Sequence, residues 1–549
     1  TGIAYPSNGN AQVHEVQLTG LERFTRYYYR VKTGTAVSDV FSFRTPPFAS
    51  DQQSFRLVAM SDMQRDNSQP DKFREIVEEG VLSYLSNGDA AIEDELALVM
   101  IPGDLVVNGN NYDQWKNTFF DPSMHLFRHV PLYPVLGNHE NNSAFYFTYF
   151  KLPENGTPGF EEHWWFKDYG NLRIIGLNSN GPFTVDEQLT WLDNVLEQTC
   201  EASSIDFVFA QLHHPHKSEL WTPGESGFTG EVISRLEQFT TNCGKPSIHF
   251  FGHTHGYSRG QSRDHKHLWI NVATAGGAID NWGEFPNFDY EEFSVSQDEY
   301  GFVLAEVTDG PSPQITIKRI GRGDQDVVEE NVVRDSLVIR LEAGVVDTPQ
   351  PEYPLNIELA PECVVLQASP FSAEGQTLHG QSHWQVSTVA TDFTNPVYDG
   401  WKNFENWYFE EDTQANDDLT DEDVSSLEAE TNYYWRVRYR DRELNWSEWS
   451  EPAAFSTGVS LALPNLLQNP GAENDLEAWQ VQEGVVEALT SGTCNGVAPH
   501  SGEQYFAVGG LCEHSPLAIA VQDVDVSAYQ DSIDTGAFVA HFGGYLSNF

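Results

Sequence analysis

From residue 55 onwards, apolar runs alternate with segments in which apolar residues recur at helical spacing. Residues 55–60 and 96–101 are mostly apolar, as expected for strands that are buried on both faces. A helix is expected over residues 70–85 and another from Tyr112. Strands that alternate with helices predict an α/β domain.

The same pattern continues to about residue 320. Further buried strands are expected at residues 172–177, 207–212 and 247–251, and antiparallel strands at residues 269–275, 301–307 and 314–319. Between the first two of these strands, Leu189, Leu192 and Val195 fit one face of a helix. We therefore assign residues 55–320 to one central α/β domain.

The segment before this domain has the short strands and turn residues of an all-β module. Strands are expected at residues 12–18, 26–33 and 40–44, closed by Pro46-Pro47. They predict a partial β-sandwich over residues 1–47. After the central domain, a polar stretch with several prolines marks residues 321–355 as a linker.

Two more β modules are expected beyond this linker. In residues 356–458, the strand Tyr433-Tyr434-Trp435-Arg436-Val437-Arg438 repeats the aromatic and basic pattern of Tyr27-Tyr28-Tyr29-Arg30-Val31. We assign Trp401, Trp407 and Trp446 to the core of this sandwich. Residues 464–549 form the last module. The predicted protein is multidomain, with a central α/β domain flanked by all-β sandwich domains.

Length and charge narrow the classes of function. A chain of 549 residues is too long for a single hydrophobic core. Acidic residues outnumber basic ones by 81 to 30, giving a formal net charge of −51. Such a surface repels nucleic acid, so we expect no nucleic-acid binding. An anionic substrate would need a locally positive site, which bound metal ions could supply.

The cysteines indicate an oxidising compartment. There are 5 cysteines and no Cys-x-x-Cys pair, so disulfides are favoured over thiolate metal sites. The plausible bridges are Cys200 with Cys243 and Cys494 with Cys512, leaving Cys363 unpaired. No apolar run approaches the roughly 20 residues that span a bilayer, so no membrane span is expected. A secreted, periplasmic or cell-surface location follows.

Candidate metal ligands follow directly after apolar runs of the central domain. At the carboxyl edge of an α/β sheet, such positions are where side chains converge. Each segment alone is a common turn or structural histidine, but together they form an ordered set. The segments are Asp62-Met63-Gln64, Gly103-Asp104, Gly137-Asn138-His139-Glu140, His213-His214-Pro215 and Gly252-His253-Thr254-His255.

This order resembles the calcineurin-like metallophosphoesterase superfamily across the whole central domain. The resemblance implies a four-layer α/β/β/α sandwich. It is closest to the purple acid phosphatase branch, because residues 252–259 look like that branch's last motif and a fibronectin type III-like segment precedes the domain. Residues 356–458 also resemble a fibronectin type III domain, and residues 464–549 resemble a galactose-binding-like jelly roll, which we expect to be incomplete.

Two positions depart from the branch. Val107 stands where purple acid phosphatases have their metal-binding Tyr, and Gln64 stands where the commoner pattern has a His. An amide oxygen is a weaker metal donor than imidazole, so the identity of the metal is left open.

Carried over by position, the resemblance implies a dinuclear centre. Asp62, Gln64 and His255 would hold one metal, Asp104 would bridge both, and Asn138, His213 and His253 would hold the other. Carboxylate, amide and imidazole ligands suit Mn, Fe or Zn. Two such ions lower the pKa of a bridging water and clamp the phosphoryl oxygens for in-line attack by metal-bound hydroxide.

The resemblance also implies further roles. His139 would protonate the leaving group or stabilise transition-state charge, and the bridging Asp104 is the second residue assigned to catalysis. His214, His216 and Arg259 are candidates for substrate contact, and Glu140 for a supporting role.

Three functions remain open from the sequence. The first is hydrolysis of small phosphate monoesters, and the second is phosphodiester cleavage of the cyclic nucleotide or glycerophosphodiester type. The third is an adhesion or binding protein whose catalytic domain has decayed, which the changes at Gln64 and Val107 would suit. The C-terminal module could contact carbohydrate or a cell surface.

Overall fold

The computed structural model describes residues 3–6, 12–85, 91–342, 344–362, 364–375, 377–425, 427–459, 465–530 and 533. The chain divides into two compact units. The first comprises Thr1–Leu355, Leu366–Glu422 and Tyr433–Ala454. The second comprises Asn356–Val365, Asp423–Asn432 and Phe455–Phe549.

One sheet of the first unit has six strands in the order β19-β18-β17-β7-β8-β9. Strands β7, β8 and β9 run parallel, and β17, β18 and β19 add to them as an antiparallel meander. The bounds are Phe55–Ala59 for β7, Leu98–Ile101 for β8, Leu132–Pro134 for β9, Gly301–Thr308 for β17, Gln314–Gly323 for β18 and Val328–Arg340 for β19.

The other sheet has nine strands in the order β10-β11-β12-β13-β15-β14-β16-β25-β26. Strands β11, β12, β13 and β15 are parallel neighbours at its centre. The bounds are Trp165–Tyr169 for β10, Leu172–Gly176 for β11, Phe207–Gln211 for β12, Ser247–Phe251 for β13, Tyr257–Gln261 for β14, His267–Val272 for β15, Phe293–Gln297 for β16, Trp407–Tyr408 for β25 and Glu411–Asp412 for β26.

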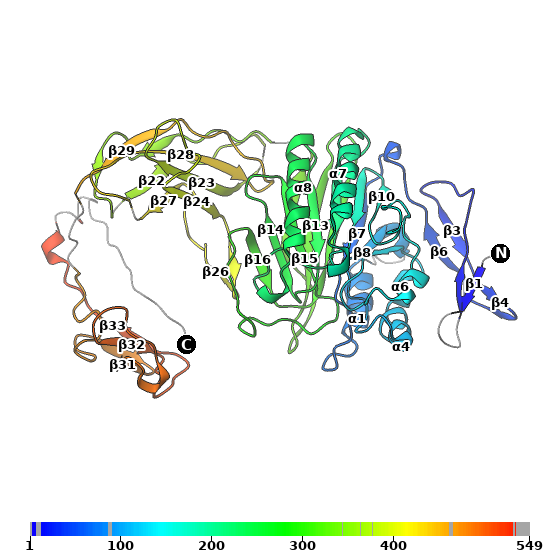
Figure 1. The fold of residues 1–549 in the computed structure, drawn as a ribbon, viewed down its shortest axis with the longest axis horizontal. Coiled ribbons are helices and arrows are strands. Elements are labelled where there is room, and N and C mark those ends of the chain that lie inside the picture. Colours follow the sequence, from blue (N-terminus) through cyan, green and yellow to red (C-terminus); the bar gives the residue numbers. More distant parts are fainter. Residues whose placement is uncertain are drawn as a thin grey trace. The chain divides into compact units, whose positions relative to one another are not determined.

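Helices cover the outer faces of these sheets. Helices α7 (Asp186–Glu201) and α8 (Gly227–Cys243) run side by side along the nine-stranded sheet (Figure 1). Their apolar faces bury Leu189, Leu192 and Leu236 against β11 and β12. The six-stranded sheet is covered by two helical runs with central π-helical turns. The first comprises α1 (Lys72–Glu75), Ile76–Leu82 and α2 (Ser83–Leu85), and the second α4 (Tyr112–Gln114), Trp115–Phe120 and α5 (Asp121–Phe127).

A single apolar core joins the inner faces of the two sheets. It contains Leu57 and Met100 from one sheet together with Ile174, Phe209 and Phe250 from the other. Helix, sheet, sheet and helix therefore stack as the four layers that the sequence predicted. The short helices α3 (Ile92–Glu95) and α6 (Ala144–Tyr149) complete this domain.

The N-terminal segment forms small antiparallel pairs. The pairs are β1 (Ile3–Pro6) with β2 (Gln12–Glu15), β3 (Arg26–Tyr29) with β6 (Phe41–Arg44), and β4 (Lys32–Thr33) with β5 (Ala36–Val37). The Tyr29 hydroxyl donates to the backbone oxygen of Arg128, which ties this segment to the central domain.

The linker predicted over residues 321–355 is wrong for much of its length. Strand β19 pairs with β18 along residues 328–340, so these residues belong to the six-stranded sheet. β19 is an edge strand in which charged and apolar residues are mixed and most side chains are partly exposed. It therefore lacks the apolar run by which buried strands are found.

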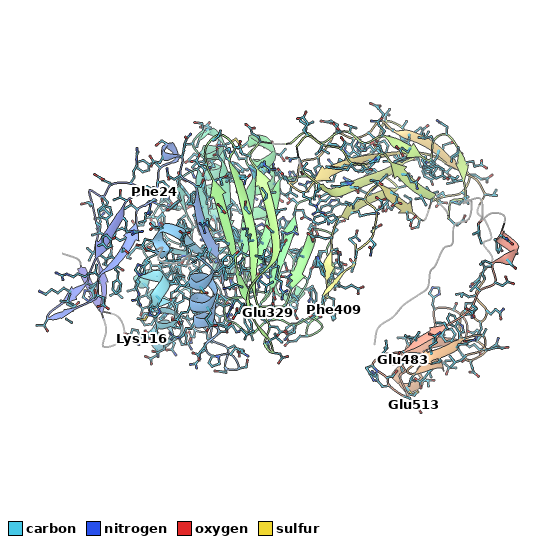
Figure 2. The ribbon with its side chains drawn as sticks, turned by 180° about the vertical axis from the view of Figure 1, so that it is seen from behind. Phe24, Lys116, Glu329, Phe409, Glu483 and Glu513 are labelled. Atoms are coloured by element: carbon cyan, nitrogen blue, oxygen red, sulfur yellow. A yellow bond between two sulfur atoms is a disulfide. The ribbon has the colours of Figure 1, made fainter. Side chains whose placement is uncertain are left out.

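The β module after the central domain is built on β23 (His379–Ser387), which pairs with β24 (Tyr398–Asn403) and β28 (Asn432–Asp441). Strand β22 (Val364–Ala368) pairs with β20 (Pro351–Tyr353), and β27 spans Asp421–Val424. A hairpin of this module, β25 and β26, extends the nine-stranded sheet of the central domain. Phe409 lies at its tip and is 52% exposed (Figure 2).

The second unit carries several short pairs. These are β21 (Glu358–Leu359) with β29 (Ala453–Thr457), β30 (Gln480–Glu483) with β33 (Ile519–Val521), and β31 (Val486–Thr490) with β32 (Gln504–Val508). The disulfides Cys200–Cys243 and Cys494–Cys512 are both formed, as predicted. Cys363 lies outside the described residues.

Among the described residues, no helix is long and apolar enough to cross a membrane.

Candidate metal centre

The predicted ligands lie where strands of the two facing sheets end. Asp62, Asp104 and Asn138 follow β7, β8 and β9 of the six-stranded sheet. His213 follows β12 of the nine-stranded sheet, and His253 and His255 follow β13. Because the parallel strands of a sheet end at one edge, each sheet delivers its ligands to a common place.

The backbone at several of these positions is strained. Asp62, Asp104 and His253 have φ angles of 58°, 53° and 72°. Residues with a Cβ seldom adopt this left-handed region, and those that do cluster at functional sites. These φ angles raise the conformational energy of the backbone locally, and they orient the three side chains toward the centre.

Glycines beside the ligands allow the strand ends to approach closely. A Cβ on Gly137 would lie 2.1 Å from Oδ1 of Asp104, and one on Gly252 would lie 2.3 Å from Oδ2 of Asp62. The glycines of these sequence motifs are therefore required by packing against the carboxylates.

One group of candidate ligands surrounds Asp104. Ligand atoms of Asp104, His213 and His253 all lie within 4.8 Å of one another. Nε2 of His213 lies 3.3 Å from Oδ2 of Asp104 and 2.9 Å from Oδ1 of Asn138. Nδ1 of His213 pairs with the backbone oxygen of Pro102 at 2.9 Å, which leaves Nε2 as the atom facing the centre.

A second group surrounds Asp62. Nε2 of His255 lies 3.3 Å from Oδ1 of Asp62 and 2.9 Å from Nε2 of Gln64. Nδ1 of His255 pairs with the backbone oxygen of Ala278, so Nε2 again faces inward. Oε1 of Gln64 is buried without a hydrogen-bond partner among the described residues. Amide oxygen and nitrogen are interchangeable by a flip, so the amide can present its oxygen to a cation.

The buried carboxylates of the cluster, Asp62 and Asp104, require positive charge close by. Burial alone would lower the pKa of His213 and His255, but Asp104 and Asp62 respectively raise both values to about 9. Burial would raise the pKa of Asp62, yet the hydrogen bond from His255 lowers it below its usual range. Metal cations bound here would supply positive charge in place of protons on these imidazoles, because ligating histidines must be neutral.

The donor set fits divalent or trivalent metals. It combines carboxylate, amide and imidazole groups without thiolate, which suits Mn, Fe or Zn. The orphaned Oε1 of Gln64 and the crowding of carboxylates with imidazoles agree with that fit.

Glu140 holds the loops that carry the candidate ligands through hydrogen bonds to their backbone. Its carboxylate is fully buried and accepts backbone N–H bonds from Asp104 at 2.9 Å, Leu105 at 2.8 Å and Gly137 at 2.8 Å. Burial and the nearby Asp104 raise the pKa of Glu140 to about 8. This residue fixes the two ligand loops relative to each other rather than facing a ligand.

His139 lies at the open side of the centre. Its Nδ1 pairs with the backbone oxygen of Val107 at 2.7 Å, and its Nε2 lies 3.8 Å from Oδ2 of Asp104. The side chain is 36% exposed. The imidazole is thus held in one orientation with Nε2 free to face an incoming group.

The three predicted substrate contacts differ in their placement. His214 lies beside the centre, where its ring is 4.4 Å from that of His253 and its Nδ1 pairs with Oγ of Ser179. His216 instead packs against Trp269 and the backbone of α8.

Arg259 is not brought to the centre. It is 3% exposed and donates to Asp335 and Glu405, each at 2.6 Å. A guanidinium saturated by two carboxylates in this way serves the junction with the β module. Its place in the last motif therefore misled the sequence interpretation.

Some residues of the site were missed. Trp221 lies 5.2 Å from the ring of His253, and Phe285 lies 5.7 Å from Trp221. Asp280 accepts the N–H of His255 at 2.7 Å. Ser179 follows β11 just as the ligands follow their own strands, so the same rule could have found it. Trp221, Phe285 and Asp280 do not directly follow a predicted strand, so this rule could not have found them.

Comparison with known proteins identifies three segments. Residues 55–257 match the calcineurin-like phosphoesterase family. Residues 2–45 match the purple acid phosphatase N-terminal domain, and residues 375–460 match the Rha78A-like N-terminal immunoglobulin domain.

Individual relatives are distant. A phosphoenolpyruvate phosphatase of Allium cepa is 22% identical over 47% of this chain and 53% of its own length. Purple acid phosphatase 15 of Arabidopsis thaliana is 23% identical over 46% of this chain and 52% of its own length. The chain thus spans about half the length of these curated relatives.

Among solved structures, the purple acid phosphatase PPD1 of yellow lupin (Lupinus luteus) has a TM-score of 0.44 at 17% identity, covering 59% of this chain and 61% of its own. PhoD also has a TM-score of 0.44, at 14% identity, covering 60% and 78%. The family matches carry the assignment: residues 55–257 are a calcineurin-like metallophosphoesterase domain, preceded by a purple acid phosphatase N-terminal domain and followed by an immunoglobulin-like β domain.

Proposed function

We propose that the protein is a dinuclear-metal-dependent phosphoesterase that hydrolyses phosphate monoesters. The observation that carries this proposal is the placement of Asp104 within reach of His213 and His253 in a cluster of convergent, strained strand ends. The calcineurin-like phosphoesterase match over residues 55–257 supports the same reaction class.

The residues present would hold two metal ions. Asp62, Gln64 and His255 would bind one, Asn138, His213 and His253 the other, and Asp104 would be shared. Bound there, two cations supply the positive charge that orients a phosphate ester and an attacking water in this acidic protein. No side chain of the chain has to act as nucleophile.

His139 would act on the leaving group. The Val107 carbonyl holds its Nδ1, so Nε2 is the atom that can donate a proton to the departing ester oxygen. Its partial exposure leaves room for that oxygen. His139→Ala should therefore lower kcat for p-nitrophenyl phosphate strongly while leaving the metal content of the protein unchanged. A proportional loss of both would make His139 structural.

The location that we propose is extracellular or periplasmic. Disulfides persist in oxidising compartments and are rare in the cytosol, and both Cys200–Cys243 and Cys494–Cys512 are formed.

The test of the function is hydrolysis of p-nitrophenyl phosphate beside bis-p-nitrophenyl phosphate. The protein is stripped with a chelator and reloaded separately with Mn, Zn or Fe. Metal-dependent turnover that favours the monoester is the expected result. Preference for the diester would change the assignment to a phosphodiesterase. Silence on both substrates together with failure to bind metal would favour a binding protein with a decayed centre.

A further inference from the structure

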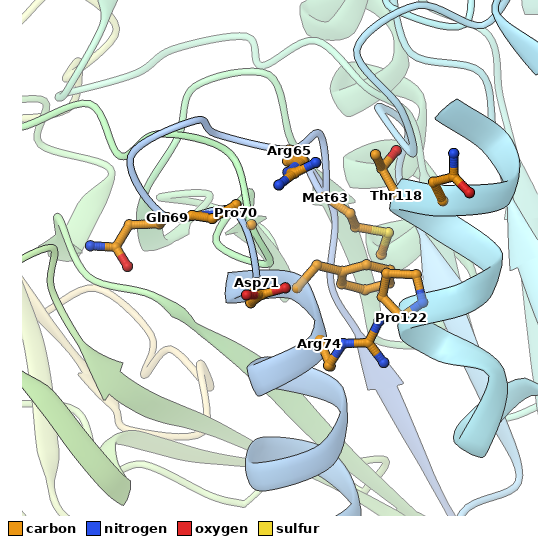
Figure 3. A pocket seen from close by; sticks show the side chains of 11 residues that line it. Met63, Arg65, Gln69, Pro70, Asp71, Arg74, Thr118 and Pro122 are labelled. Carbon is orange, nitrogen blue, oxygen red and sulfur yellow. The ribbon is translucent and has the colours of Figure 1, made fainter. Parts of the chain in front are cut away.

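A small pocket of about 100 Å³ lies beside the loop that follows β7 (Figure 3). Its lining includes Met63, Arg65, Gln69, Arg74, Thr118 and Gly276. A single water needs about 10–15 Å³ of such volume. The pocket can therefore admit a group of several heavy atoms, such as a carboxylate or a phosphate.

The pocket is built partly from backbone segments that also carry candidate metal ligands. Met63 stands between Asp62 and Gln64 in the chain, and its N–H donates to the backbone oxygen of Asp104 at 2.9 Å. Gly276 precedes Gly277, whose N–H donates to the backbone oxygen of Asp62 at 2.7 Å. The walls of the pocket are thus the same backbone segments that carry the predicted ligands.

Two arginines give the pocket a positive charge. Arg65 comes from the loop after β7 and Arg74 from helix α1 (Figure 3). The lining contains a single carboxylate, Asp71. Such a balance is unusual in a chain whose formal charge is −51.

The guanidinium donors of this pair are largely free. Arg65 is exposed and has no hydrogen bond or ion pair within the described part of the chain. Among the described residues, Arg74 pairs only with Glu78, at 3.8 Å, and 41% of the Arg74 side chain is exposed. By contrast, Thr118 and Gln69 already donate to backbone oxygens of Gln114 and Gln325.

We propose that this pocket is a subsite for a second anionic group of the substrate, so that the enzyme prefers phosphate esters whose leaving group carries a carboxylate or a phosphate. Arginine binds both groups through paired N–H donors. The inference rests on the proposed function, since it assigns a further contact to the substrate of the same reaction.

The kinetic test compares 4-carboxyphenyl phosphate and 1,4-phenylene bisphosphate with phenyl phosphate, using metal-loaded full-length protein. Wild type should favour at least one doubly anionic ester by about tenfold in kcat/KM, the size of one charge-assisted contact. Which of the two is favoured distinguishes carboxylate from phosphate recognition. Arg65→Gln should abolish the preference and leave kcat for phenyl phosphate within about twofold.

Two further arginine variants test whether the preference depends on Arg65 in particular. Arg23→Gln, which alters a 53% exposed arginine paired with Asp51, should keep the preference. Arg74→Gln should weaken it less than Arg65→Gln, because Glu78 already attracts Arg74. Equal kcat/KM ratios in wild type and Arg65→Gln would overturn the subsite.

Binding of 4-carboxybenzylphosphonate and benzylphosphonate by calorimetry separates this inference from the catalytic one. If phenyl phosphate is not hydrolysed with any metal, the proposed function fails, whereas the phosphonates still report on Arg65. Tighter binding of the carboxylated compound that is lost in Arg65→Gln supports the subsite. Equal binding of the two compounds by wild type rejects it.

Discussion

The strand ends of the central domain and its junction with the following β module both bury charged side chains, but they neutralise them in different ways. At the junction, the buried Arg259 donates to the carboxylates of Asp335 and Glu405, each at 2.6 Å. The charge of this cation is therefore neutralised by carboxylates of the chain itself.

At the strand ends the balance is incomplete. Asp62 and Asp104 are 0% and 1% exposed, and their charged neighbours are imidazoles that are themselves crowded together. Burial and the neighbouring His213 lower the pKa of His253 to about 2. Oε1 of Gln64 has no partner among the described residues, and φ is positive at Asp62, Asp104 and His253.

The difference separates structural from functional burial of charge. Paired charges hold two domains together and need nothing further. A cluster that combines strained backbone, crowded carboxylates and an orphaned acceptor is the arrangement that we propose to hold metal ions.

The largest effect is expected from Asp104→Asn. The amide keeps the shape but removes the charge that the two proposed metal ions would share, so turnover of p-nitrophenyl phosphate should fall by about a thousandfold. The far-UV circular dichroism spectrum should not change. Asp193→Asn, at a 56% exposed residue paired with Arg235, is the matched control. Undiminished turnover in Asp104→Asn would refute the shared-ligand assignment.

The second largest effect is expected from removal of the metal. A metal at about a thousand times its Kd stabilises the folded state by about 4 kcal/mol, so chelation should lower the melting temperature of the metallophosphoesterase domain by several degrees. Differential scanning calorimetry with and without chelator measures this shift. In Asp104→Asn the shift should be much smaller. An identical shift in both proteins would mean that the metal acts elsewhere.

A substitution at the junction should lower the stability of the protein without changing its metal affinity. Glu405→Gln leaves Arg259 with one carboxylate instead of two and should cost about 2 kcal/mol of unfolding free energy. Metal affinity should stay the same. Urea denaturation and a metal titration of the same variant check both statements. A loss of metal affinity without a loss of stability would reverse the roles of the two regions.

The smallest effect concerns Glu219, a fully buried carboxyl group that accepts hydrogen bonds from the Ser296 hydroxyl and the backbone N–H of Tyr290. Burial raises its pKa to about 8, against the lowering effect of the Ser296 hydroxyl. A raised folded-state pKa gives stability that is complete below the unfolded pKa of about 4.3 and is lost as pH rises through about 8. Between pH 7 and pH 8, wild type should lose about 1 kcal/mol more unfolding free energy than Glu219→Gln. Parallel losses in urea denaturation at the two pH values would mean that the carboxyl group is ionised at neutral pH.

Much of the central fold was predictable because its strands are buried on both faces. The prediction for residues 247–251 coincides with β13, and that for residues 207–212 differs from β12 by one residue. The same burial made the strand ends visible, since polar residues directly after an apolar run stand out. This is why the ligand segments could be proposed from the sequence.

Features that depend on contacts between distant segments were not predictable. β19 lies at a sheet edge and alternates too irregularly to be recognised. Trp407, predicted as sandwich core, is 42% exposed because its hairpin leaves the β module and pairs with β16. Arg259 sits next to the ligand motif in sequence, but the partners that bury it come from residues 335 and 405.

The most direct test of the dinuclear centre is the number of metal ions bound per chain after stripping and reloading with Mn, measured by elemental analysis on wild type and Asp104→Asn. A dinuclear centre predicts about two ions per wild-type chain and a clear loss in the variant. Wild-type protein that retains no metal, or a variant that retains as much as wild type, would contradict it.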